Sequence, residues 1–191
     1  MSINVITAGP SAGKSSTIRH LSACGYRTLP EAARILFDQR ISEGDDPDDV
    51  RKEDDFHEQV ESISRKIEAH LPGVKCELTA SNAVLNSTQL YGEDVFLDRS
   101  LADNLAYREH FGNADCDEYE RVYSTVKNRY DNVFLLDRIE FVDDEVRSED
   151  EEEASEIHRI LKKTYEQMSC DVYEVPVIPI DERCEYILER V

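Results

Sequence analysis

The fold is decided by the stretch Ala8-Gly9-Pro10-Ser11-Ala12-Gly13-Lys14-Ser15. It follows an apolar, β-branched run at residues 3–8, which predicts a short buried strand. It also opens a predicted helix over residues 14–24, for which Gly25 is a suitable stop. A strand, a glycine-containing turn and a helix in this order form the phosphate-binding P-loop pattern, with Ala8 where the first glycine usually stands.

Each part of this loop has a chemical role. The glycines let the backbone curl so that its N–H groups point inward, and the helix N-terminus adds a positive dipole. Lys14 is placed to reach the β- and γ-phosphates, the Ser15 hydroxyl suits Mg²⁺, and Ser16 can contact the α-phosphate. The predicted loop residues for the nucleotide are Gly9, Pro10, Ser11, Ala12, Gly13, Lys14, Ser15 and Ser16. The predicted cofactors are therefore ATP and Mg²⁺.

Two motifs that are missing from the sequence limit which class of nucleotide is expected. The sequence contains no G-x-G-x-x-G, which argues against a dinucleotide-binding fold. It also lacks the Asn-Lys-x-Asp motif that would be expected of a guanine-specific protein.

Length and charge limit the class further. The 191 residues suit one domain, and 40% hydrophobic content is enough to build a core. With 42 acidic against 22 basic residues the net charge is −20, so the long-range field repels phosphate polymers. Nucleic acid is thus disfavoured as a partner, whereas a single metal-bound nucleotide can still be held at short range.

The rest of the chain alternates between strand and helix patterns. Further strands are predicted at residues 26–29, 95–97, 133–136 and 172–177, and helices at 31–41, 56–71, 101–111, 119–130 and 152–168. We therefore expect one α/β domain over residues 1–191, a three-layer P-loop NTPase fold with a central parallel sheet of about five strands. Three segments lie outside this pattern: a mobile acidic loop at 43–55, an irregular excursion at 75–92 and a lid at 138–151.

Two carboxylates are expected at the mouth of the nucleotide site. Asp98 ends an apolar strand, and in open α/β sheets ligands collect outside the carboxyl ends of the strands. It can hold Mg²⁺ or take a proton from an acceptor hydroxyl, or it can simply cap the following helix. Glu31 follows the second strand and suits a general base, or it can be a favourable acid in the first turn of a helix.

Three arginines are candidates for binding phosphate. Arg99 follows Asp98 and can clamp a phosphate or order the acceptor. Arg138 and Arg147 lie in the predicted lid, where a mobile arginine brought over the γ-phosphate would neutralise the charge that develops during transfer. The alternative is that these two arginines are solvated among acidic neighbours.

The remaining signals are mainly negative. Five scattered cysteines with no C-x-x-C pair indicate reduced thiols, and the five histidines show no zinc-ligand spacing. No apolar run is long enough to span a membrane, and the N-terminus leaves no room for a signal peptide. A cytoplasmic location is expected.

Taken together, the loop and the segments at 25–34, 98–107 and 146–151 resemble the AAA-type ATPase domain family related to nicotinamide riboside kinase. The resemblance implies a kinase-like fold, ATP with Mg²⁺, and an acceptor pocket beside the second and third strands. It implies that Lys14 and Ser15 bind phosphate and metal, and that Glu31 is placed like the base of deoxynucleoside kinases. It also implies that Asp98-Arg99 is similar to the acidic-Arg motif of nucleoside kinases, and that Arg147 is a lid arginine. The stretch at 75–92 is longer than the family pattern.

Three functions follow as hypotheses. The first is an ATP-dependent kinase of a small, hydroxyl-bearing, nucleoside-like metabolite, with Lys14, Glu31, Asp98, Arg99 and Arg147 as its catalytic residues. The second is a slow nucleoside triphosphatase that acts as a regulatory switch with a protein partner and has a shallow or sealed acceptor pocket. The third, a polynucleotide kinase, is opposed by the net charge. The sequence leaves open whether Glu31 or Asp98 is the base, and whether the protein is a homodimer.

Overall fold

The computed structural model describes residues 2–10, 12–69, 71, 94–112, 116–138, 151–168 and 170–191. Five parallel strands form one sheet in the order β2-β3-β1-β4-β5, which confirms the predicted α/β class. The strands are β1 (Ile3–Thr7), β2 (Arg27–Leu29), β3 (Val95–Asp98), β4 (Asn132–Leu136) and β5 (Asp171–Val175). The last strand ends before Pro176, which has no N–H for the ladder, so the prediction that it reached residue 177 was too long.

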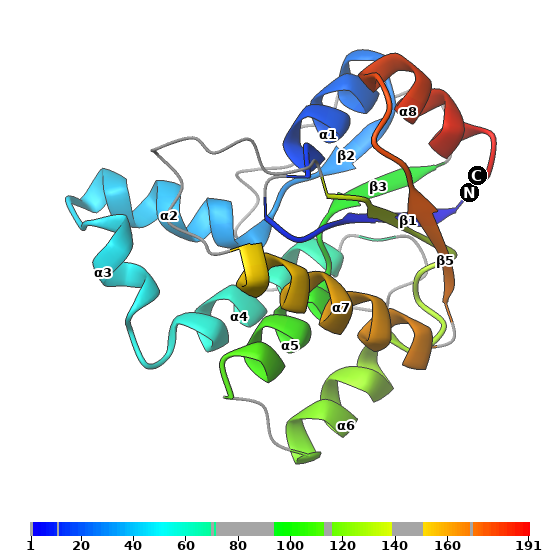
Figure 1. The fold of residues 1–191 in the computed structure, drawn as a ribbon. Coiled ribbons are helices and arrows are strands. Elements are labelled where there is room, and N and C mark those ends of the chain that lie inside the picture. The colour runs from blue at the N-terminus through cyan, green and yellow to red at the C-terminus, as the bar shows by residue number, and fades with distance from the viewer. Residues whose placement is uncertain are drawn as a thin grey trace.

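Helices cover both faces of this sheet, giving the three predicted layers (Figure 1). One face, with Ile6, Phe96 and Phe134, packs against α1 (Lys14–Ala23) and α8 (Ile180–Leu188). The opposite face packs against α5 (Leu101–His110) and α7 (Glu151–Gln167). Neighbouring strand residues thus point to opposite layers, which explains why the central strands are apolar runs without alternation.

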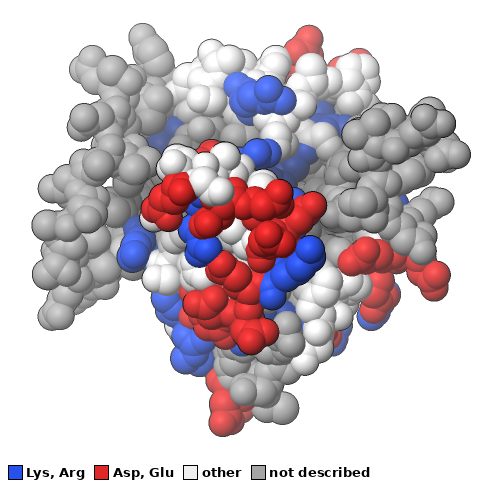
Figure 2. Space-filling view, turned by 90° about the vertical axis from the view of Figure 1, so that its left-hand side faces the viewer, with Lys and Arg blue, Asp and Glu red and all other residues white. Residues whose placement is uncertain are grey.

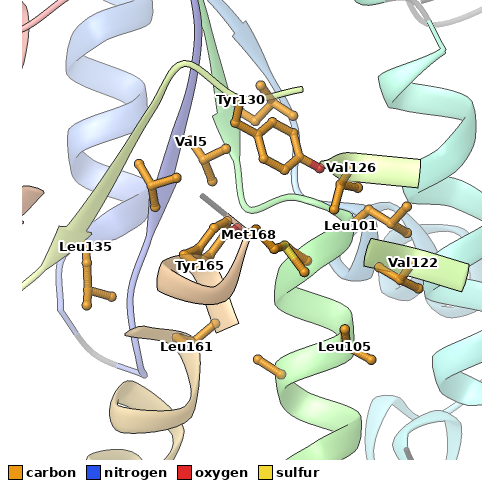
Figure 3. Close-up of a cluster of buried hydrophobic side chains, with 14 of the residues drawn as sticks. Val5, Leu101, Leu105, Val122, Val126, Tyr130, Leu135, Leu161, Tyr165 and Met168 are labelled. Atoms are coloured by element: carbon orange, nitrogen blue, oxygen red, sulfur yellow. The ribbon is translucent and has the colours of Figure 1, made fainter. Parts of the chain in front are cut away.

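The larger core lies between the sheet, α5 and α7 (Figure 3). Val5 and Leu135 of the sheet face Leu101 of α5 and Leu161 of α7 there, and all four are at most 1% exposed. Tyr165 also lies in this core, and its hydroxyl is hydrogen-bonded to Ser100, 2.6 Å away. This core fixes the start of α5, which immediately follows the functional end of β3.

A smaller cluster joins three helices beside the sheet: α2 (Ala32–Glu43), α3 (Pro47–Arg51) and α4 (Phe56–Glu68). The acidic segment at 43–55, which was predicted to be a mobile loop, contains the short helix α3 and so is not a loop throughout. The Asp46 side chain accepts a hydrogen bond from the Asp48 N–H at 2.9 Å, and Pro47 occupies the first turn. Arg40 also binds Asp45 and Glu53, which ties both ends of the segment to α2. Local capping therefore orders a stretch whose acidic composition suggested a loop.

Glu68 fastens this helical unit to the main core. Its carboxylate accepts hydrogen bonds from the Leu101 N–H at 2.6 Å, the Arg129 guanidinium at 2.6 Å and the Tyr130 hydroxyl at 2.9 Å, and the residue is 1% exposed. The long predicted helix ends at this residue rather than at Leu71. Glu68 thereby sets α4 relative to α5, the two helices that wall the cavity described below.

One further helix prediction needs correction, and one helix was missed. The helix expected at 119–130 is α6 (Cys116–Val126), which begins earlier and ends before the turn at Asn128. Helix α8 was not predicted, although Ile180, Cys184 and Ile187 have the spacing of a buried helical face.

Several predictions lie outside the described residues: the excursion at 75–92, the lid over 139–150 with Arg147, and Ser11 of the loop. Among the helices that the structure does describe, none is both long and apolar enough to cross a membrane.

Candidate active site

The loop after β1 has the backbone expected of a phosphate cradle. Gly13 adopts a left-handed conformation with φ of 79°, and its carbonyl accepts hydrogen bonds from the N–H groups of Ser16 and Thr17 at 3.2 and 3.1 Å. Helix α1 begins at the next residue, Lys14. The positive end of the helix dipole therefore lies at the loop, and Ser15 and Ser16 are exposed on its first turn.

Gly9 lies where a side chain would meet α7. A Cβ atom at this position would lie 3.1 Å from the Ala154 carbonyl and 3.6 Å from the His158 Cβ on α7. The phosphate loop and α7 therefore pack directly against each other, and any side chain at Gly9 would push them apart.

Arg183, which the sequence reasoning missed, supports the loop from the other side. It lies on α8, is 5% exposed, and donates from Nη1 to the Ala12 carbonyl at 3.1 Å and to the Thr17 hydroxyl at 3.4 Å. The available signal was a charged residue between Ile180, Cys184 and Ile187, whose spacing is that of a buried helical face, since buried arginines need partners.

Lys14 brings the two predicted carboxylates together. Its ammonium donates a hydrogen bond to Asp98 and another to Glu31 Oε2 at 3.2 Å. Glu31 Oε1 in turn accepts a hydrogen bond from Arg99 Nε at 2.9 Å. Two acidic and two basic side chains, from the start of α1 and from the ends of β2 and β3, thus form one cluster, which we call the Lys14 cluster: Lys14, Glu31, Asp98 and Arg99.

The structure shows how the two carboxylates relate to the helices that follow them. Glu31 occupies the N-cap position of α2, but its side chain makes no capping hydrogen bond. Asp98 does not cap α5 either, because Ser100 is the N-cap and forms a capping box with Asp103. Both carboxylates therefore form hydrogen bonds within the Lys14 cluster, while the Glu31 charge still lies at the positive end of the α2 dipole.

Arg99 is held in an unusual backbone conformation. Its φ of 65° lies in the left-handed region, which carries a strain cost for residues other than glycine. Its guanidinium binds Asp103 at 3.3 Å as well as Glu31, and stacks on the Tyr107 ring with 4.8 Å between Cζ and the ring centroid. Asp103 is itself fixed by Thr7 and Tyr165. Arg99 is thus rigidly placed beside Glu31.

The electrostatics of the two carboxylates differ. Burial tends to raise the pKa of Glu31, but the charges of Arg99 and Lys14 outweigh it and leave the pKa below its usual value. Burial dominates at Asp98 and raises its pKa, and the nearby charge of Glu31 acts in the same direction. Two neighbouring carboxylates with opposite pKa shifts are typical of catalytic sites.

A cavity of about 820 Å³ opens beside the Lys14 cluster. It is bounded by Pro10 of the phosphate loop, by Glu31, Asp98 and Arg99, and by side chains of α2 to α5. Its wall is rich in aromatic groups, which include Phe37, Phe56, His57, Tyr107 and Phe111. Such a mixture of flat apolar surface and a few convergent charges is characteristic of small-molecule sites.

The face of the molecule formed by α2 and α3 carries many exposed acids. Figure 2 shows acidic side chains gathered at the centre of the face that α2 and α3 present. Exposed acids there include Asp45, Asp46, Asp48 and Asp49. A long polyanion would meet repulsion on this side of the molecule, in line with the net charge.

Of the two arginines in the predicted lid, the structure describes Arg138. Arg138 lies just after β4 and donates a hydrogen bond to the Ser155 hydroxyl at the start of α7. It is not part of the Lys14 cluster, and Arg147 lies outside the described residues.

The side chains of Ser15 and Asp98 fit a magnesium ion that would take most of its other ligands from nucleotide phosphates and water. The described part of the chain has no group of three or more His, Cys, Asp or Glu side chains that could hold a metal by themselves. The oxygen donors of Ser15 and Asp98 suit Mg²⁺, which typically takes one or two protein oxygens and completes its shell with phosphates and water.

A parallel sheet with a glycine loop between β1 and α1, a lysine at the start of that helix and a carboxylate at the end of β3 defines a P-loop nucleotide-binding protein. Residues 4–183 match the family model described as an AAA domain. The chain therefore belongs to this AAA domain family, as its resemblance indicated. No match was found among curated proteins.

Solved structures confirm the kinase-like fold. Deoxyadenosine kinase from M. mycoides with bound dATP has a TM-score of 0.56 at 15% identity, over 100% of this chain and 98% of that one. Thymidylate kinase from Candida albicans has a TM-score of 0.62 at 13% identity, over 99% and 90%. NadR protein in complex with NR has a TM-score of 0.62 at 18% identity, over 91% of this chain but only 43% of the NadR chain.

Proposed function

We propose that the protein is a kinase that transfers the γ-phosphoryl group of ATP to a hydroxyl group of a small, nucleoside-like metabolite. The observation that carries this proposal is the aromatic-walled cavity of about 820 Å³ directly against the Lys14 cluster. It is large enough for a nucleoside, and it places an acceptor beside the end of the phosphate loop.

The phosphate side of the reaction would depend on the loop and Lys14. Backbone N–H groups of the loop bind the phosphates, and the Lys14 ammonium moves from its carboxylate partners to the β- and γ-phosphates. Ser15 and Asp98 are the residues that would hold Mg²⁺, which when bound neutralises phosphate charge. Arg138 and Arg147 would add positive charge from the lid.

The acceptor side would depend on Glu31. Its side chain is 24% exposed, against 12% for Asp98, so it is the more accessible carboxylate of the pair. Its lowered pKa keeps it ionised near neutral pH, and Arg99 fixes its direction. Glu31 would therefore align the acceptor hydroxyl and accept its proton as the new O–P bond forms. Asp98 remains close enough to assist through the metal.

The same cavity favours a kinase over a regulatory switch. The switch hypothesis expects a shallow or sealed acceptor pocket, whereas this one is open to solvent and lined with binding groups. A polynucleotide kinase is disfavoured because the net charge of −20 and the exposed acids on the face of α2 and α3 would repel a polyanion.

The test is acceptor-stimulated release of ADP. The purified protein is given Mg²⁺-ATP and a panel of hydroxylated metabolites, with nucleosides and deoxynucleosides first. We expect at least one nucleoside-like compound to increase ADP release and to yield its monophosphate. Slow hydrolysis that no compound stimulates would overturn the kinase proposal and support the switch.

A further inference from the structure

The far wall of the cavity contains a histidine and an asparagine locked to each other. His57 of α4 and Asn104 of α5 both line the cavity, and Asn104 is 7% exposed. The His57 Nδ1 atom lies 3.1 Å from Asn104 Oδ1, and Asn104 Nδ2 donates to the backbone carbonyl of His57 at 3.0 Å. The oxygen and the nitrogen of the Asn104 side-chain amide therefore both bind His57, which joins α5 to α4.

This arrangement fixes the tautomer of His57. Because the Asn104 NH₂ group is used by a carbonyl, the atom facing the imidazole is the amide oxygen, which can only accept. His57 Nδ1 must then carry the proton. In a neutral imidazole the other nitrogen, Nε2, is left with a lone pair and acts as an acceptor.

The surroundings keep the ring neutral near pH 7. Burial lowers the pKa of His57, and the charge of Arg108 acts in the same direction. The hydrogen bond to Asn104 and the charge of Glu58 raise the pKa, but they do not outweigh burial. No hydrogen bond joins Nε2 to any residue that the structure describes, and Nε2 is not among the buried side-chain nitrogens that lack a partner there.

Two aromatic rings pack against the His57 ring. The Phe56 ring lies edge-on to His57 with 5.3 Å between centroids, and the Phe111 ring lies at 5.9 Å. Phe37 stacks on Phe56 at 5.6 Å and also lines the cavity. An aromatic heterocycle can stack here while one of its edges meets His57.

We propose that His57 is a specificity residue, which accepts a hydrogen bond from an N–H or amino group on the ring of the phosphoryl acceptor. Asn104 is its positioning residue. The inference rests on the proposed kinase function and adds the chemistry of the ring: a heterocycle with a donor on its edge. A ring that presents only carbonyl oxygen or unprotonated nitrogen there would place two lone pairs against each other, and a site built to hydrogen-bond rejects such an analogue.

The experiment compares acceptors that differ by one amino group. The two pairs are adenosine with purine riboside, and cytidine with the riboside of 2-pyrimidinone, each measured as kcat/KM for ADP release. For the wild type we expect at least about tenfold preference for the amino compound of the pair that is turned over. The His57→Phe protein should keep turnover but show a preference of no more than about twofold. The His20→Phe protein is the matched control, since His20 lies on α1 beside Asp181 and does not line the cavity, and it should keep the wild-type preference.

A second measurement tests the positioning role without any substrate. The ¹⁵N shifts of the His57 imidazole should show the proton on Nδ1 in the wild type. In Asn104→Leu they should show a mixture of tautomers, with the acceptor preference reduced.

The outcomes separate the two proposals. Turnover with no amino preference, or a preference that His57→Phe retains, would overturn the role of His57 and leave the kinase intact. A proton on Nε2 in the wild type would do the same. Absence of any acceptor-dependent turnover would overturn the proposed function and, with it, this inference.

Discussion

The ammonium of Lys14 donates a hydrogen bond to the carboxylate of Asp98, which joins the phosphate loop after β1 to the end of β3. Both side chains are largely buried, with 8% and 12% exposed. Glu31 lies at 3.2 Å from the same ammonium. One lysine therefore neutralises two carboxylates, and phosphate groups compete with these carboxylates for it.

The first prediction concerns Lys14→Ala. Loss of charge-assisted hydrogen bonds to phosphate, each worth about 1.5–3 kcal/mol, should weaken ATP binding by roughly 10- to 150-fold. Titration calorimetry with Mg²⁺-ATP measures this. The substitution also leaves Glu31 and Asp98 without their shared cation, so the melting temperature should fall. A folded Lys14→Ala protein that binds and turns over ATP like the wild type would contradict the assigned site.

The second prediction concerns Glu31→Gln. The amide keeps the shape of the side chain but cannot accept a proton, so kcat for acceptor phosphorylation should fall by about 10²- to 10⁴-fold. The affinity for ATP should change little, because Glu31 lies on the acceptor side of Lys14. Glu43→Gln, at the exposed end of the same helix, is the matched control and should behave like the wild type. Equal kcat values for both variants would remove Glu31 from catalysis and leave Asp98 as the candidate.

The third prediction concerns stability against pH. The pKa of Glu31 is lowered in the native state by Arg99 and Lys14, against an ordinary value of 4.5. Its contribution to the free energy of unfolding is therefore fully present above pH 4.5 and is lost as the pH falls through the lower native pKa. Urea unfolding of wild type and Glu31→Gln should show the wild type more stable at pH 7 and the difference shrinking below pH 4.5. A difference that is constant with pH would show that Glu31 is not held by these charges.

The sequence predicted the sheet and the Lys14 cluster because their signals are local. The runs at residues 95–97 and 133–136 are apolar and are each followed by an aspartate, and the loop motif occupies eight consecutive positions. Since the carboxyl ends of parallel strands meet at one edge, residues as distant as Lys14 and Asp98 could be expected to lie together.

The missed features depend on contacts between distant segments. Arg183 supports Ala12 from 171 positions away, and His57 pairs with Asn104 across 47 positions. No periodicity connects such partners, so only the packing of α8 on α1 and of α4 on α5 reveals them. The ordered α3 was missed for another reason: its cap, Asp46, was one acid among many in a stretch that composition marks as a loop.

The fourth prediction concerns Arg183→Met. Methionine can fill most of the buried space, but it removes the donor to the Ala12 carbonyl and to Thr17. A loosened phosphate loop should weaken ATP binding by roughly 5- to 10-fold, equivalent to about 1–1.4 kcal/mol, while the acceptor KM stays within about twofold. Arg159→Met is the control, because Arg159 pairs with Glu156 on the exposed face of α7. Equal ATP affinity in both variants would show that Arg183 serves only the packing of α8.

The last prediction concerns Gly9→Ala. The new Cβ would lie 3.1 Å from the Ala154 carbonyl, so either the phosphate loop or the start of α7 must shift by a few tenths of an ångström. We expect a loss of about 1–3 kcal/mol in stability together with weaker ATP binding. Gly112→Ala separates this crowding from backbone strain: its φ of 72° is unfavourable for alanine, but a Cβ there meets no atom within 4 Å. Calorimetry should therefore find reduced ATP affinity for Gly9→Ala alone. If both variants bind ATP like the wild type, the contact between the loop and α7 does not shape the nucleotide site.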